Sequence, residues 1–148
     1  MKINTKQKKL LTTGAVALAV VALLLPFVFS SRGFRTLQIH GESVQLEVVS
    51  TPAAQSKGLG GRATMSNDRG MLFTFAQPTV QCFWMKDMQF SLDIVWLNSS
   101  KKVVMIEKDV SPKTYPKAFC APTTAYVIEI NAGKAASLGI RTGETLRF

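Results

Sequence analysis

Residues 10–29 form an uncharged run of 20 residues, LLTTGAVALAVVALLLPFVF. As a helix rising about 1.5 Å per residue, this run is roughly 30 Å long, which matches the hydrocarbon core of a bilayer. Four lysines precede the run, at positions 2, 6, 8 and 9, whereas two arginines follow it closely, at positions 32 and 35. This asymmetry predicts a cytoplasmic N-terminus. We therefore expect residues 1–9 to be a cytoplasmic basic segment and residues 10–29 to be a transmembrane anchor.

Two other interpretations of the apolar run remain open. A cleaved signal peptide is one, because residues 28–30 resemble a cleavage site, although the run exceeds the usual signal core of about 7–15 residues. A buried core helix is the other. The anchor and the signal peptide both place the rest of the chain outside the cytoplasm, in the periplasm or at the cell surface. We expect a single-pass protein that meets the membrane through residues 10–29.

The net charge of +9 raises the question of nucleic-acid binding. Residues 1–35 carry six Lys and Arg and no acid, so they hold +6 of this charge. Residues 36–148 carry twelve Lys and Arg against nine Asp and Glu. Most of the basicity therefore belongs to the segment that orients the chain in the membrane. Without a basic stripe interleaved with aromatic residues, nucleic acid is not an expected partner.

Residues 43–148 contain the patterns of a single β domain, preceded by a linker over residues 30–42. Alternating apolar residues over 43–50 predict a half-buried strand. Short helices are expected after Thr51-Pro52 and before Gly139. Further strands are predicted at 70–75, 80–86, 92–98, 103–109, 125–131 and 144–148, with 92–98 and 103–109 as a hairpin. The fold class is mainly β with two short helices, in a small compact barrel- or sandwich-like domain.

The strand LDIVWL, residues 92–97, is apolar on both faces, which is typical of a central strand. Asp93 lies within it, where a bare carboxylate is costly. It must therefore form an ion pair, accept hydrogen bonds from the backbone, or line a polar pocket. Arg62 is the preferred partner because its planar fork suits a carboxylate.

A second group of polar candidates lies in CFWMK, residues 82–86. Trp84 and Met85 point to opposite strand faces, so at least one of them belongs in the core. Lys86 follows the aromatic residues, and its stem is expected to extend toward the rim, where it can meet an anionic ligand. Glu129, in VIEIN, is expected to face solvent.

Four segments of the chain form a recognisable pattern: GLGGR (58–62), RGMLFTF (69–75), CFWMKDMQFSLDIVWL (82–97) and YVIEINAGKAASLGIRTGETL (126–146). Together they resemble the domain of unknown function 192 family. The resemblance implies a compact, mostly β fold of an often exported domain, and it implies no established activity. Gly60 stands where the family usually has Met, and Asp87-Met88 where it usually has Asn-Thr. Arg62, Trp84, Lys86 and Asp93 match the family pattern, and we take them as the ligand-binding candidates.

Cys82 and Cys120 are the only two cysteines. In an exported domain two cysteines predict one disulfide. Buried free thiols are the alternative, as is a Cu(I) site with neighbouring methionines. The single His, His40, falls in the predicted linker, so triads with a histidine base and histidine-rich zinc sites have no support. We expect no metal and no cofactor.

These features predict a membrane-anchored extracytoplasmic domain that acts as a binding or accessory module for an unknown envelope ligand or protein. The alternatives are an envelope-associated enzyme acting on a polymer or lipid, and a structural assembly partner of another envelope protein. The sequence contains no recognisable catalytic motif, so no catalytic residue is assigned and the binding role is preferred.

Overall fold

The computed structural model describes residues 33–148, and the predicted anchor at 10–29 lies outside them. Within the described part the strands are β1 (Phe34–Ile39), β2 (Glu42–Val49), β3 (Arg69–Trp84), β4 (Leu92–Leu97), β5 (Val103–Val110) and β6 (Ala118–Asn131). The helical elements are α2 (Pro52–Lys57), the 3₁₀ turn η1 (Pro112–Thr114) and α3 (Lys134–Ser137). Across residues 33–148, no helix has the length and apolar character needed to cross a membrane.

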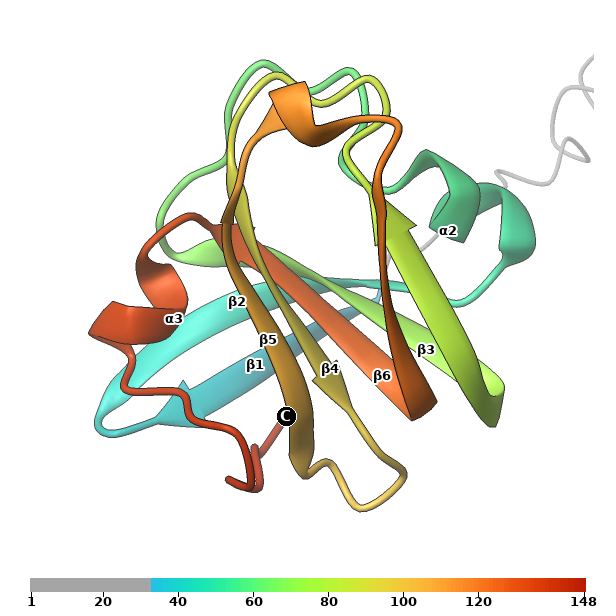
Figure 1. The fold of residues 1–148 in the computed structure, drawn as a ribbon. Helices are drawn as coiled ribbons and strands as arrows, with labels where there is room; N and C mark the ends of the chain where they lie inside the picture. The colour runs from blue at the N-terminus through green and yellow to red at the C-terminus, as the bar shows by residue number, and fades with distance from the viewer. Residues whose placement is uncertain (1–32) are drawn as a thin grey trace, which may run out of the picture. The chain divides into compact units, whose positions relative to one another are not determined.

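The six strands form one open mixed sheet in the order β1-β2-β3-β6-β4-β5 (Figure 1). β2 and β3 run parallel, whereas the other neighbouring pairs are antiparallel. The parallel pair requires a crossover, and α2 supplies it. As predicted, Thr51 caps α2 by accepting a 3.3 Å hydrogen bond from the Ala54 amide, and Gly58, at φ 50°, ends the helix.

Each face of the sheet carries its own hydrophobic core. The first core packs against α3 and the C-terminal segment, and it includes Leu46, Leu72, Val95, Ile128 and Leu138. The second core lies on the α2 side, and it includes Phe73, Met85, Ile94, Trp96 and Val127. Figure 1 shows α2 and α3 on opposite sides of the molecule, which agrees with this division. Because both faces are covered, β4 is buried along its whole length, as LDIVWL predicts.

The mainly β class with two short helices is confirmed, but the strands form an open sheet rather than a barrel or a sandwich. We also predicted more strands than the sheet contains. Segments 70–75 and 80–86 are parts of one strand, β3, and the strand predicted at 125–131 is only the second half of β6, which begins at Ala118. Pro78 and Pro122 lie where the β3–β6 register shifts, so these prolines occupy bulges instead of ending the strands.

The two ends of the described chain also differ from expectation. The predicted linker over residues 30–42 contains β1, which pairs with β2 along six residues. The predicted last strand at 144–148 forms two isolated bridges instead, Gln38↔Arg147 and Lys102↔Thr145. This segment therefore connects edge strand β1 with the β4–β5 turn. Alternating apolar residues in both short segments pack against the first core.

Candidate functional site

A pocket of about 290 Å³ opens between α2 and the outer half of β3. The end of α2 and the following Gly58–Gly60 turn form one side, and β3 with the turn after it forms the other. The lining residues are Gln55, Ser56, Lys57, Gly58, Leu59, Gly60, Phe73, Phe75, Gln81, Cys82, Phe83, Trp84, Lys86, Met88 and Glu129. Trp84 and Lys86, two of the predicted ligand-binding residues, therefore lie in one pocket.

Glu129 is the acidic side chain in the pocket lining, and it is 5% exposed. It lies near the C-terminal end of β6, between Met71 of β3 and Ile94 of β4 in the sheet register. Its Oε2 atom is buried and has no hydrogen-bond partner in the described part of the chain. The predicted solvent-facing position of Glu129 is therefore wrong. β6 is a central strand, so both of its faces are covered.

Burial raises the pKa of Glu129 from its ordinary value near 4.5 to about 8, and the positive charge of Arg62 opposes this rise. The loss of hydration destabilises the carboxylate more than the cation stabilises it. Glu129 is consequently protonated at neutral pH. A protonated carboxyl group in a pocket offers an O–H donor as well as an acceptor oxygen.

Arg62 lies near Glu129, but its guanidinium forms an ion pair with another acid. Its Nη2 atom donates a 2.8 Å hydrogen bond to Glu47 Oε2. Glu47 faces the same side of the sheet as Glu129, because both register with Met71 of β3. The charge of Arg62 is thus balanced by Glu47, which leaves Glu129 without a counter-ion of its own.

The rim of the pocket is aromatic and basic. Trp84 is 50% exposed, whereas its neighbour Met85 is buried, so the expectation that one of the two belongs in the core is confirmed. Lys86 is exposed, as a rim residue should be, and Lys57 is exposed on the α2 side. Neither lysine forms an ion pair with another described residue.

Backbone contacts hold the two sides of the pocket together. The Gly61 amide donates a 2.9 Å hydrogen bond to the Asp87 carbonyl. Gly60 approaches the backbone so closely that an added Cβ would lie 3.0 Å from the Lys57 carbonyl oxygen and 3.4 Å from that of Lys86. The segments GLGGR and WMKD, which are far apart in the sequence, are therefore neighbours. The glycine at position 60 permits this approach.

The pocket's inner wall is an aromatic cluster. The Phe73 and Phe83 rings meet edge to face with centroids 4.7 Å apart, and Phe83 meets Trp96 in the same way at 5.9 Å. The Trp96 indole donates to the Gln81 carbonyl at 3.1 Å, which ties β4 to the outer part of β3. Such edge-to-face pairs fix ring positions and give the pocket a rigid apolar wall.

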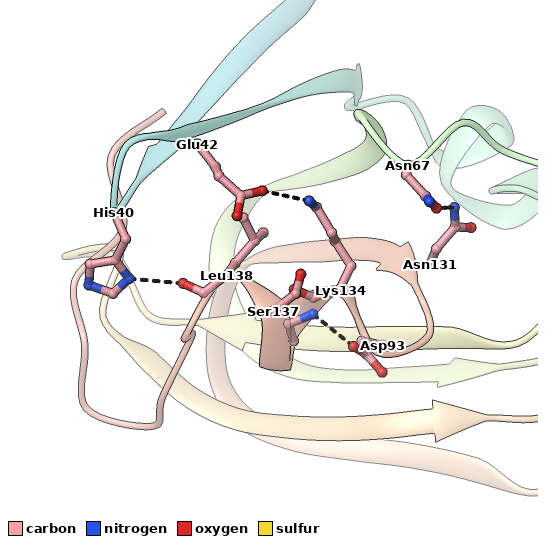
Figure 2. A network of polar contacts seen from close by, with 9 residues as sticks. His40, Glu42, Asn67, Asp93, Asn131, Lys134, Ser137 and Leu138 are labelled. Carbon is pink, nitrogen blue, oxygen red and sulfur yellow. Dashed lines mark hydrogen bonds and ion pairs between the residues drawn. The ribbon is translucent and has the colours of Figure 1, made fainter.

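Asp93 does not belong to this pocket. It faces the first core, on the α3 side of the sheet, whereas Glu129 faces the second core. Its Oδ1 atom accepts from the Asp109 amide and its Oδ2 atom from the Ala135 amide, both at 2.9 Å. Figure 2 shows the carboxylate directed at the start of α3. The predicted Arg62–Asp93 pair is therefore wrong, because two backbone amides satisfy Asp93.

The predicted disulfide is confirmed. Cys82 of β3 and Cys120 of β6 are directly opposite in the register and are bonded to each other. Both residues are exposed, and Cys82 also lines the pocket. The disulfide therefore fixes one edge of the pocket rim to β6. Residues 33–148 include no cluster of three or more His, Cys, Asp or Glu side chains suited to a metal ion.

Several pocket residues were not predicted from the sequence, and Glu129 is the most informative. Tyr126, Ile128 and Ile130 occupy one face of its strand, and Val127 precedes it on the other face. A strand apolar on both faces is usually central, so the reasoning that placed Asp93 in the interior also applies to Glu129. Gln55 and Gln81 have no such signal, because polar residues of this kind are common on surfaces.

Comparison with known proteins identifies the family. The model of the DUF192 family, described as Uncharacterized ACR, matches residues 35–148. A search of curated proteins finds no match. A solved structure of a protein of unknown function from Novosphingobium aromaticivorans DSM 12444 is similar, with a TM-score of 0.74 and 28% identity over 82% of this chain and 89% of that one.

A second similar structure comes from Sinorhizobium meliloti 1021 and is named as a candidate transcription regulator. Its TM-score is 0.70, with 28% identity over 76% of this chain and 89% of that one. The family match covers the whole sheet, the pocket and the C-terminal segment. This chain therefore belongs to the DUF192 family of uncharacterized proteins.

Proposed function

We propose that the described domain is a binding module for a small ligand, and that the pocket between α2 and β3 is its binding site. The observation that carries the proposal is Glu129, a buried carboxyl group that lines the pocket and has an unpartnered oxygen. Native proteins rarely leave a buried polar atom without a partner unless it has a functional role or meets a solvent molecule or ligand. The exposed Trp84 and Lys86 at the rim extend the same surface toward solvent.

The arrangement favours binding over catalysis. Carboxylate pairs that perform general acid–base chemistry must face one another across a substrate. Asp93 lies on the other face of the sheet, and Glu47 is held by Arg62 at 2.8 Å. The two cysteines are joined in a disulfide, and His40 binds the Leu138 carbonyl on the α3 side of the sheet. Among the described residues, no second acid and no histidine lines the pocket together with Glu129.

We also propose that the domain lies outside the cytoplasm and is tethered to the membrane through residues 10–29. The charge asymmetry around the apolar run supports this orientation. The Cys82–Cys120 disulfide supports an oxidising compartment. Protease added to intact spheroplasts should remove a C-terminal tag from the domain. A domain that stays protected until the membrane is permeabilised would contradict the proposed orientation.

The binding proposal can be tested with a fragment screen on the full chain in a nonionic detergent. The chain contains two tryptophans, which give two indole N–H signals in ¹H–¹⁵N spectra. Ligands of the pocket should shift the signal of the half-exposed Trp84. They should lose affinity for the W84A and K86A variants. Fragments that leave the Trp84 signal unmoved and bind all three proteins equally would contradict the assignment of the site.

A further inference from the structure

The charges around the pocket indicate which kind of ligand it accepts. Lys57 and Lys86 line it from opposite sides, one at the end of α2 and the other after β3. Both are exposed, and neither has an acidic partner within residues 33–148. Arg62 is not among the lining residues, and its charge is balanced by Glu47. With Glu129 protonated, the lining carries positive charge only, and this favours an anionic group near the rim.

The interior of the pocket places a different requirement on the ligand. The unpartnered Oε2 of Glu129 is buried, and the residues beside Glu129 on the neighbouring strands are the apolar Met71 and Ile94, so an ionised form has little solvation. A protonated carboxyl group instead donates its O–H to an acceptor. The aromatic wall formed by Phe73 and Phe83 suits a flat apolar body. The pocket volume of about 290 Å³ is that of a small-molecule site.

We propose that the ligand is a small organic anion with a flat apolar body, whose anionic group meets Lys57 and Lys86 and whose far end accepts a hydrogen bond from Glu129. This inference rests on the proposed binding function and adds the chemical class of the ligand. A cationic ligand would require an ionised Glu129 in an apolar setting and would face two lysines at the rim. The lysines and Glu129 therefore act together in selecting against cations.

Binding of such a ligand is linked to the protonation of Glu129. The charged group that acts on Glu129 is Arg62 from the loop after α2, which is paired with Glu47 of β2 on the same face of the sheet. Lys57 and Lys86 line the same pocket. The side chains beside it on β3 and β4 are the apolar Met71 and Ile94. Because the ionised form loses the donor and repels the anion, affinity is expected to fall as the pH rises through about 8.

A set of probes of one shape tests the ligand class on the full chain in nonionic detergent. 4-Acetylbenzoate carries an anionic group and an acceptor carbonyl at opposite ends of one ring. 4-Acetylbenzamide and 4-acetylbenzylamine replace the anion by a neutral group and a cation, and 4-isopropylbenzoate removes the acceptor. Kd values come from titrating the Trp84 indole signal. We expect 4-acetylbenzoate to bind roughly tenfold more tightly than each of the other three, as one lost hydrogen bond or ion pair produces.

Two variants assign the preference to residues. The K57A/K86A double variant should lose the preference for the anion over the amide while still binding the amide.

The affinity of the wild type for 4-acetylbenzoate should fall about tenfold between about pH 6.5 and about pH 9, since only the protonated fraction of Glu129 binds. The E129Q variant should show a flat profile. Lys57 and Lys86 are exposed, so the K57A/K86A variant still tests the ligand class even if E129Q is poorly folded.

The outcomes separate this inference from the binding function on which it rests. If the amide or the amine binds as tightly as the benzoate, or if the wild-type pH profile is flat, the inference is overturned and the binding function stands. If none of the four probes moves the Trp84 signal at millimolar concentration, both the ligand class and the assignment of the pocket are overturned.

Discussion

Arg62 donates a 2.8 Å hydrogen bond to Glu47, and its guanidinium also acts on Glu129, where it opposes the rise in pKa that burial causes. Two opposing effects therefore act on the pKa of Glu129. Burial favours the protonated form of Glu129, and Arg62 favours the ionised form. The balance depends on how much of the Arg62 charge Glu47 screens.

Removing the Glu47 charge should therefore lower the pKa of Glu129. In E47Q, Arg62 keeps its charge but loses its ionised partner, so its attraction for an ionised Glu129 increases. We expect the pKa of Glu129 to fall below about 8, measured from ¹³C shifts of the side-chain carboxyl groups. E42Q is the matched control, because Glu42 lies in the same strand but pairs with Lys134 on the α3 side (Figure 2). An equal shift in both variants would contradict this account.

The stability of the domain should fall as the pH rises from about 4.5 to about 8. The folded state binds the Glu129 proton more tightly than the unfolded state does, since burial raises the pKa to about 8. The stabilisation from this proton is complete below the unfolded pKa and is lost as the pH approaches the folded pKa. The loss is on the order of 4 kcal/mol in the free energy of unfolding.

Denaturant unfolding at a series of pH values measures this effect. The E129Q variant supplies the control, because its amide resembles the protonated carboxyl group and does not titrate. Its free energy of unfolding should vary less with pH over this window and should exceed that of the wild type at the alkaline end. Parallel curves for the two proteins would show that Glu129 ionises freely in the folded state.

Truncating Asp93 should destabilise the domain strongly. D93A removes the acceptor of two backbone amides, the part-buried amide of Asp109 and the buried amide of Ala135. Unsatisfied buried groups of this kind cost about 1–3 kcal/mol each, so a total loss of roughly 2–4 kcal/mol is expected in thermal or denaturant unfolding. The exposed Asp68 provides a control, and D68A should change stability by less than about 1 kcal/mol. A comparable effect of the two substitutions would refute the role assigned to Asp93.

Removing the disulfide should destabilise the domain and disturb the pocket rim. The two cysteines are 38 residues apart in sequence, and a loop of this size contributes about 4 kcal/mol in the chain-entropy model. The C82S/C120S variant should lose stability of this order. Because both cysteines are exposed, a reductant should weaken the wild type but not the variant. A loss well below 1 kcal/mol would mean that the β3–β6 pairing is sufficient without the bond.

The interior placement of LDIVWL could be predicted because a strand that is apolar on both faces is covered on both faces. The partners of Asp93 could not be predicted. Every residue except proline has a backbone amide, so the sequence does not show which amides will bind a carboxylate. Arg62 was instead the cation with the best geometry for a carboxylate, and the fold placed it on the other face. The burial of Glu129 was predictable in principle from its own strand.

The open form of the sheet and the lengths of its strands were harder to predict from the sequence than the burial of LDIVWL. Prolines ordinarily interrupt strands. Pro78 and Pro122 fit within β3 and β6 because the register between these strands shifts there, and the register is known only from the structure. Strand spacing also does not determine whether a sheet closes. The pocket needs segments separated by more than 20 residues to meet, through contacts such as the one from Gly61 to Asp87. Such contacts are set by the fold as a whole.

The bridge between Gln38 and Arg147 joins β1 to the C-terminal segment, and the Phe148 ring packs against Tyr126 with centroids 5.6 Å apart. The cover of the first core therefore depends on contacts between residues far apart in the sequence. Such contacts form only after the entropy cost of closing a long loop has been met. Folding of this domain is consequently expected to be slower than that of a helical bundle of the same size, in which most contacts are local.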